Sequence, residues 1–267
     1  MPKIFAGEIE LYYEEHGTGA PLVLIPGFGT GLWIWFKQVQ DFSKEFRTVC
    51  FDPRGISRSE APDAPITIRT IAGDVAALLK SLRIESAHIL GASFGGFVAQ
   101  EFALGFPEMT RSLTLCCTSF GGPNHVPPTL ETLQALASTK GLNTQQRVRE
   151  NLLLAFSPAY VERRRDEVEK VIALRAQNFV PEYAYLHQLQ AALEFNAEER
   201  VSRITAPTLV LSGDADIIVP VENSSNLAAR IPGARLAIIK GGSHTFFIEQ
   251  AEELNAAVIE FIKENER

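Results

Sequence analysis

Short, mainly apolar runs recur along the chain, at residues 22–25, 48–51, 87–90 and 113–117. Runs of this kind are typical of parallel strands that are buried on both faces of a sheet. Between them, apolar residues spaced three and four apart predict helices over residues 32–42, 68–82 and 94–102. Thr67 is the expected N-cap of the second helix. The alternation of strands and helices predicts a parallel sheet with helices on both faces.

The strand pattern stops near residue 120 and returns at residues 208–211 and 236–239, before a last helix over residues 252–262. Between residues 120 and 208, only helical patterns occur, at residues 130–136, 146–156, 159–176 and 181–193. One more strand is expected early in the chain, at residues 9–14. We therefore expect a core of residues 1–119 and 202–267 with an inserted helical region, residues 120–201.

The balance of charge argues against several classes of partner. Lys and Arg number 25 and Asp and Glu number 32, which gives a net charge of −7. A nucleic-acid binder or a protein held on anionic lipid needs a basic surface, so neither is expected. The basic run at residues 163–165 is followed by acids and is interpreted as a solvated helix face. No signal peptide and no apolar window of about 18 residues is present, so a cytoplasmic protein is expected.

The three cysteines, Cys50, Cys116 and Cys117, lie in apolar runs. They are expected to be buried free thiols, as in a reducing compartment. No Cys-x-x-Cys pattern occurs, so no metal site is predicted.

Ser93 stands in the pattern Gly-x-Ser-x-Gly, directly after an apolar strand and at the start of a helix. In such a tight turn, the residues two positions before and after the serine need to be glycine. The turn lifts the hydroxyl clear of the sheet, and the helix N-terminus offers N–H groups to a developing oxyanion. The alternative is a serine that merely caps the helix.

Two further strand ends carry polar residues suited to acid–base chemistry. Asp214 and Asp216 follow the strand at 208–211, and His244 lies in a glycine-rich loop after the strand at 236–239. Among the five histidines, His244 is the one placed in such a loop. The carboxyl ends of parallel strands meet at one edge of the sheet, which is where ligands bind. An ordinary Asp-rich turn and a structural histidine are the alternatives.

The loop Gly27-Phe28-Gly29 follows the first buried strand and can supply a second oxyanion donor. The competing interpretation is a dinucleotide fingerprint. That pattern needs a third glycine at position 32 or 34, where the chain has Leu32 and Ile34. No nicotinamide cofactor is therefore expected, and nothing else in the sequence implies a metal or organic cofactor.

Taken in chain order, these motifs resemble the α/β-hydrolase superfamily over almost the whole length. Residues 26–29, with Trp35 downstream, resemble its oxyanion loop, and residues 52–59 resemble its Asp-x-Arg-Gly-x-Gly-x-Ser motif. Residues 120–201 resemble its cap. Pro26 replaces the usual His, and Ser57 replaces the second glycine of the arginine motif. The resemblance implies an eight-stranded, mostly parallel sheet.

The resemblance also implies a Ser-His-Asp triad of Ser93, His244 and Asp216, with an oxyanion hole made by the N–H groups of Phe28 and Phe94. Asp216 is preferred to Asp214 because acids in the family stand three residues after the turn glycine, here Gly213. A residue next to that glycine also tends to be used in the turn itself.

The implied activity is hydrolysis of a small-molecule carboxylic ester or lactone, as in the esterase and enol-lactonase group. A serine nucleophile disfavours epoxide hydrolases and haloalkane dehalogenases, which use Asp. Carbon–carbon bond hydrolases, cofactor-free haloperoxidases and non-catalytic ligand sensors on this fold stay open. The expected pocket residues are aromatic, although such residues more often belong to a core: Trp33, Phe156, Tyr183 and Phe246.

Overall fold

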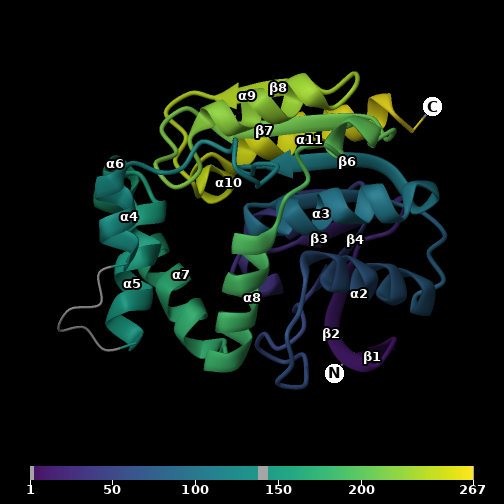
Figure 1. The fold of residues 1–267 in the computed structure, drawn as a ribbon, viewed down its shortest axis with the longest axis horizontal. Coiled ribbons are helices and arrows are strands. Elements are labelled where there is room, and N and C mark those ends of the chain that lie inside the picture. Colours follow the sequence, from purple (N-terminus) through teal and green to yellow (C-terminus); the bar gives the residue numbers. More distant parts are fainter. Residues whose placement is uncertain (1–2, 138–143, 267) are drawn as a thin grey trace.

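The computed structural model describes residues 3–137 and 144–266. Its eight strands form one sheet in the order β1-β2-β4-β3-β5-β6-β7-β8 (Figure 1). Strands β3 to β8 pair in parallel, and β1 and β2 pair antiparallel with their neighbours. The strands are β1 (Lys3–Ala6), β2 (Ile9–His16), β3 (Pro21–Ile25), β4 (Arg47–Phe51), β5 (Ala87–Ala92), β6 (Thr110–Cys116), β7 (Thr208–Gly213) and β8 (Arg235–Ile239).

The predicted α/β architecture is confirmed, including the mostly parallel eight-stranded sheet. Within β3, Val23 packs in one hydrophobic cluster while Leu24 packs in the other, on opposite faces. Both side chains are fully buried. This explains the unbroken apolar run, because a strand covered on both faces has no position where a polar residue meets water. Strand β1 was not predicted, since it is short and lies at the sheet edge.

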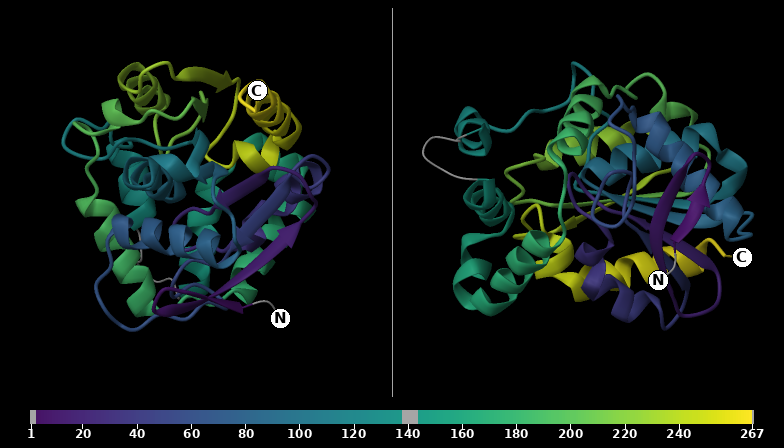
Figure 2. Two further views of the ribbon diagram at one scale, coloured as in Figure 1. Left: turned by 90° about the vertical axis from the view of Figure 1, so that its right-hand side faces the viewer. Right: turned by 90° about the horizontal axis from the view of Figure 1, so that it is seen from below.

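Helices cover both faces of the sheet (Figure 2). On one face lie α2 (Ile68–Ser81), α3 (Phe94–Gly105) and α9 (Val221–Arg230), and on the other lie α1 (Phe36–Phe42) and α11 (Ala251–Glu264). Thr67 caps α2 as predicted, in a reciprocal capping box with Thr70. Helix α9 was missed because its sequence is largely polar and Leu227 is its one buried apolar side chain.

Two expected helices are interrupted. The first turn of the helix expected over residues 32–42 is a 3-10 helix, η1 (Leu32–Trp35), which precedes α1. The helix expected over residues 159–176 breaks at Arg164, whose φ and ψ of −125° and 38° leave the helical region. The basic run at 163–165 therefore spans a helix junction, where Arg164 pairs with Glu167 at 2.6 Å. In the part of the chain described, no helix has the length and apolar character needed to cross a bilayer.

The segment between β6 and β7 is helical, as predicted, and lies beyond the carboxyl ends of the parallel strands (Figure 1). Its two ends lie side by side, since Gly122 N–H donates to Phe195 O and Ala197 N–H donates to Phe120 O. The division into a core and a separate cap stays a prediction, and we call residues 120–201 the insertion. Its helices are α4 (Leu130–Ala137), α5 (Thr144–Ala155), α6 (Pro158–Arg163), α7 (Arg165–Gln177) and α8 (Glu182–Glu194).

All three cysteines are free and buried, as predicted. Burial in apolar surroundings raises the pKa of each thiol, because the charged thiolate is poorly solvated there. They are therefore packing residues with little thiolate character.

Candidate active site

Ser93 occupies the turn between β5 and α3 in a conformation that non-glycine residues rarely adopt, with φ of 54° and ψ of −120°. The flanking glycines make this turn possible. A Cβ on Gly91 would stand 2.2 Å from Gly95 O, and a Cβ on Gly95 would stand 2.2 Å from Ile25 O. Any larger residue at either position would collide with backbone, so the glycine spacing follows from the close approach of strand and helix.

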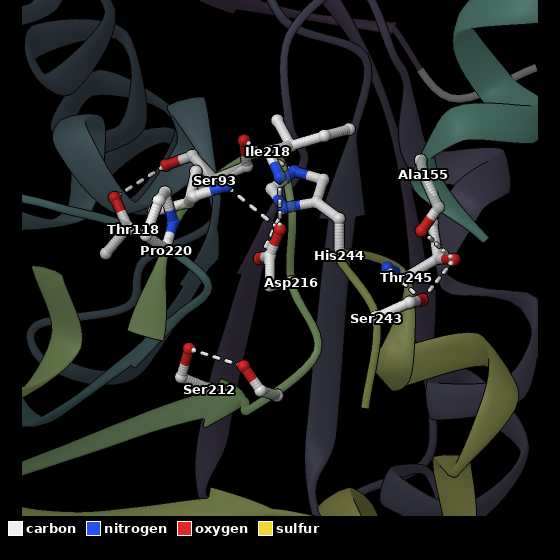
Figure 3. Close-up of polar contacts among 12 residues, drawn as sticks. Ser93, Thr118, Ala155, Ser212, Asp216, Ile218, Pro220, Ser243, His244 and Thr245 are labelled. Carbon is white, nitrogen blue, oxygen red and sulfur yellow. Dashed lines mark hydrogen bonds and ion pairs between the residues drawn. The ribbon is translucent and has the colours of Figure 1, made fainter. Parts of the chain in front are cut away.

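Three hydrogen bonds hold the strained turn, and Figure 3 shows the one from the Thr118 hydroxyl. The N–H of Ser93 donates to Cys116 O at 2.9 Å, and its carbonyl accepts from Gly96 N–H at 2.8 Å. The hydroxyl of Thr118 donates to the same carbonyl at 2.8 Å. Thr118 had no sequence signal, because it supports Ser93 from a different strand end.

His244 connects Ser93 to Asp216 (Figure 3). Its Nε2 lies 3.1 Å from the Oγ of Ser93, and its Nδ1 lies 2.8 Å from Oδ2 of Asp216. The Asp216 side chain is fully buried, and that of His244 is 12% exposed. Ser93 and His244 are 151 positions apart in the sequence, so the fold brings the two together.

The two candidate acids have different partners. Asp216 Oδ1 accepts from the N–H groups of Ile218 and Val219, at 2.8 and 2.9 Å, which leaves Oδ2 for His244. Asp214 instead accepts from the N–H of Gly241. The structure thus places Asp216, not Asp214, against the histidine.

The Gly27–Gly29 loop lies beside Ser93. A Cβ on Gly27 would stand 3.6 Å from the Cβ of Ser93. The rings of Phe28 and Phe94 meet edge to face with centroids 6.0 Å apart. Within residues 3–137 and 144–266, the N–H groups of Phe28 and Phe94 donate to no protein acceptor. Both are therefore available to a ligand oxygen.

The loop that carries His244 is tied to the insertion through Glu249. The Glu249 carboxylate accepts from the Ser243 hydroxyl and from both the N–H and the hydroxyl of Ser157. Thr245, on the other side of His244, donates its N–H and hydroxyl to Ala155 O (Figure 3). Glu249 had no sequence signal, since an acid at the end of a short apolar helix carries no mark of its partners.

The aromatic residues expected in the pocket have varied surroundings. Phe156 stacks on Tyr160 with centroids 5.8 Å apart, and the hydroxyl of Tyr183 donates to Ala61 O at 3.1 Å. Phe246 is fully buried in the core, and Trp33 is buried with its indole N–H unpartnered among the residues described. Their place in a substrate pocket stays a prediction.

One group of side chains has the donor atoms for a metal ion. The ligating atoms of Cys117, Asp216 and His244 lie within 4.8 Å of one another. Asp216 and His244 already share a hydrogen bond, and burial raises the pKa of Cys117, which disfavours the thiolate that metals bind. The set is thus better suited to the Ser–His–Asp hydrogen-bond chain than to coordination.

Residues 20–251 match the protein-family model of the alpha/beta hydrolase fold. The chain belongs to the α/β-hydrolase family. This match spans most of the sheet, the insertion and all three residues of the hydrogen-bond chain. The family resemblance drawn from the sequence motifs is therefore confirmed.

Relatives of this α/β hydrolase include enzymes of several substrate classes. It is 29% identical to the "Putative carbamate hydrolase RutD" of Azorhizobium caulinodans, covering 99% of both chains. It is 30% identical to a poly(3-hydroxyalkanoate) depolymerase of Ectopseudomonas oleovorans, covering 91% of this chain and 84% of that one. Among solved structures, the enol-lactonase of Burkholderia xenovorans LB400 has a TM-score of 0.86 at 28% identity, covering 98% of this chain and 100% of that one.

Proposed function

We propose that this α/β hydrolase cleaves small-molecule carboxylic esters or lactones through an acyl-enzyme on Ser93. The observation that carries the proposal is the hydrogen-bonded chain from the Ser93 hydroxyl through His244 to buried Asp216. A serine hydroxyl is a weak nucleophile, and an adjacent imidazole oriented by a carboxylate is the arrangement that activates it.

In this proposal, each residue has a role that its contacts support. Nε2 of His244 accepts the Ser93 proton as the hydroxyl attacks the carbonyl carbon. Asp216 accepts the Nδ1 proton, which keeps Nε2 free to act as the base and stabilises the imidazolium. The N–H groups of Phe28 and Phe94 would hold the oxyanion, each contributing about 3 kcal/mol. The imidazolium then gives the Ser93 proton to the leaving oxygen as the C–O bond of the ester or lactone breaks, which leaves the acyl-enzyme. Water activated by His244 finally releases the acyl group and restores the Ser93 hydroxyl.

Carbamate hydrolysis is a second candidate, favoured by the relative that matches 99% of the chain and bears that name. A carbamate presents the same carbonyl to Ser93, with nitrogen on one side in place of carbon. Carbon–carbon bond cleavage, haloperoxidation and ligand sensing without turnover are also compatible with the fold, because fold alone does not set the reaction.

The test is a substrate panel with a matched pair of serine variants. We expect turnover of p-nitrophenyl esters or of lactones by the wild type. Ser93→Ala should lose turnover by a factor on the order of 10⁶, whereas Ser225→Ala, at an exposed serine of α9, should retain it. A serine-directed organophosphate should label the wild type and not Ser93→Ala.

Several results would replace the proposal. Carbamate turnover without ester or lactone turnover would move the substrate class to carbamates. Labelling of Ser93 with no turnover of any substrate would favour a sensor. Retention of ester hydrolysis by Ser93→Ala would remove Ser93 as the nucleophile.

A further inference from the structure

An arginine of the insertion lies against the Gly27–Gly29 loop without a carboxylate partner. Arg175, on α7, donates from Nη1 to Asn178 O at 3.1 Å. Its Nη2 lies 3.7 Å from where a Cβ of Gly29 would stand. Arg175 forms no ion pair with any acid in residues 3–137 and 144–266. The side chain is half-buried, and this burial lowers the pKa of its guanidinium. A half-buried cation without a counterion is costly unless a ligand supplies the charge.

A second unpartnered donor contacts the same loop. Gln188, on α8, is fully buried, and its Oε1 accepts from the N–H of Gly29 at 2.9 Å. This bond determines the orientation of the amide, because only the oxygen can accept. The Nε2 therefore points away from that N–H, and it has no acceptor among the residues described. Buried amide donors are normally hydrogen-bonded, so an unpaired one indicates a missing acceptor.

Both donors are close to the proposed nucleophile. Gly29 is two residues from Gly27, whose Cβ position is 3.6 Å from the Cβ of Ser93. Because successive Cα atoms are about 3.8 Å apart, the donors lie on the order of 10 Å from Ser93. The ring of Tyr185 packs against Phe28 at 4.7 Å, on the same side of the loop. An acyl chain of a few carbons attached to Ser93 can span this distance.

We propose that Arg175 and Gln188 bind a carboxylate of the substrate, so that the preferred ester or lactone is an anionic one. Both groups offer N–H donors, and a carboxylate offers only acceptors in the planar arrangement that a guanidinium matches. One cation and one neutral amide suit a monoanion better than a phosphate dianion. This inference rests on the proposed hydrolytic function of Ser93.

The kinetic test compares two esters of equal chain length. Mono-p-nitrophenyl glutarate carries a carboxylate, and p-nitrophenyl pentanoate does not. We expect Arg175→Met to lower kcat/KM for the glutarate ester roughly 10- to 100-fold, mainly through KM, with pentanoate hydrolysis unchanged. Arg163→Met is the matched control, because Arg163 is an exposed arginine of the insertion that also donates to a backbone carbonyl.

Gln188→Glu is a second variant with a sharper expectation. It keeps an oxygen for the N–H of Gly29, but it replaces the amide donor and adds a negative charge beside Arg175. The glutarate ester should lose its advantage over the pentanoate ester, while pentanoate turnover shows that the loop still functions. An equal loss on both esters in the Arg175 and Gln188 variants would overturn the proposal.

Calorimetric titration with free glutarate separates this proposal from the proposed function, since it does not require turnover. Wild type should bind glutarate at least about tenfold more tightly than Arg175→Met. If neither ester is hydrolysed, the hydrolytic function fails while the titration still decides the carboxylate site. Equal glutarate affinity in the two proteins, or no measurable binding to the wild type, would refute the site.

Discussion

The side chains proposed to carry the chemistry depend on backbone groups as much as on one another. Asp216 has two backbone N–H donors on Oδ1, so its carboxylate is held in one orientation before His244 binds to Oδ2. Asp214, two residues earlier, stabilises the start of the His244 loop through Gly241. The two carboxylates of this turn therefore have different partners. Asp216 bonds to the imidazole of His244, and Asp214 bonds to the backbone of Gly241.

This difference predicts that Asp216→Asn lowers turnover by roughly 10⁴, because the amide favours the wrong tautomer of His244. Asp214→Asn should retain most of the turnover and lower the melting temperature instead, since it weakens the bond to Gly241. Turnover of both variants, measured beside thermal melts, tests the assignment. The reverse ranking would move the acid to Asp214.

The loop that carries His244 and the junction of α5 and α6 are linked by one acid. Glu249 lies in the short helix α10 (Phe246–Glu249) and accepts hydrogen bonds from Ser243 and from Ser157 at the N-cap of α6. Ser57 adds a second link, with its N–H donating to Phe179 O and its hydroxyl bonding to Asn178. It keeps a left-handed φ of 53° where the family motif has glycine. The insertion is thus hydrogen-bonded both to the helix next to the His244 loop and to the loop of Ser57.

From this arrangement we expect Glu249 to position His244. Glu249→Gln has one oxygen where Ser157 and Ser243 present several donors, so the loop should loosen and kcat should fall about tenfold with little change in KM. Glu253→Gln, at an exposed acid of α11, is the control. A melting temperature that falls with kcat unchanged would indicate a purely structural role.

At the scale of the whole molecule, a buried histidine in β5 makes the stability of the fold depend on pH. His88 packs inside β5 with Nδ1 2.8 Å from the Ser112 hydroxyl and no hydrogen-bond partner for Nε2 among the residues described. Glu266 Oε1 lies 3.7 Å from Nε2, beyond hydrogen-bond reach and partly exposed. Burial, aided by the positive charge of Arg111, lowers the pKa of His88 from 6.5 to about 4.

The free energy of unfolding should fall in acid, because the imidazole of His88 stays neutral in the folded protein. Above pH 6.5, His88 is neutral whether the chain is folded or unfolded, so its contribution to stability is complete. Between pH 6.5 and about 4, only the unfolded chain binds the proton, and the free energy of unfolding falls. By pH 4.5, we expect a loss of roughly 2–3 kcal/mol from this group.

Urea unfolding of the wild type and His88→Asn at pH 7.5 and 4.5 measures this loss. The variant should be less stable than the wild type at pH 7.5, and the gap between them should narrow in acid. A gap that stays constant would show that His88 does not titrate as its burial requires. The other titratable groups change the free energy of unfolding of both proteins equally, so their effects cancel in the comparison.

The chain pattern alone was sufficient for seven of the eight strands, the helical character of the insertion and the positions of Ser93 and His244. Each of these depends on local physics: unbroken apolar runs mark doubly covered strands, and glycines flank a turn too tight for a Cβ. Helix α9 was not predicted because it has few apolar residues. The break at Arg164 was not predicted because it depends on packing.

Long-range contacts were beyond the reach of the pattern. The family resemblance already favoured Asp216 over Asp214, but the bond from Asp216 to His244 exists only because β7 and β8 end side by side. Thr118, Gln188, Arg175 and Glu249 are ordinary polar residues of loops and helices, and no periodicity marks them. Thr118, Gln188 and Glu249 bond to partners far away in the sequence, at Ser93, Gly29 and Ser157, and Arg175 approaches Gly29 from a distant helix. Only the folded backbone brings these groups together.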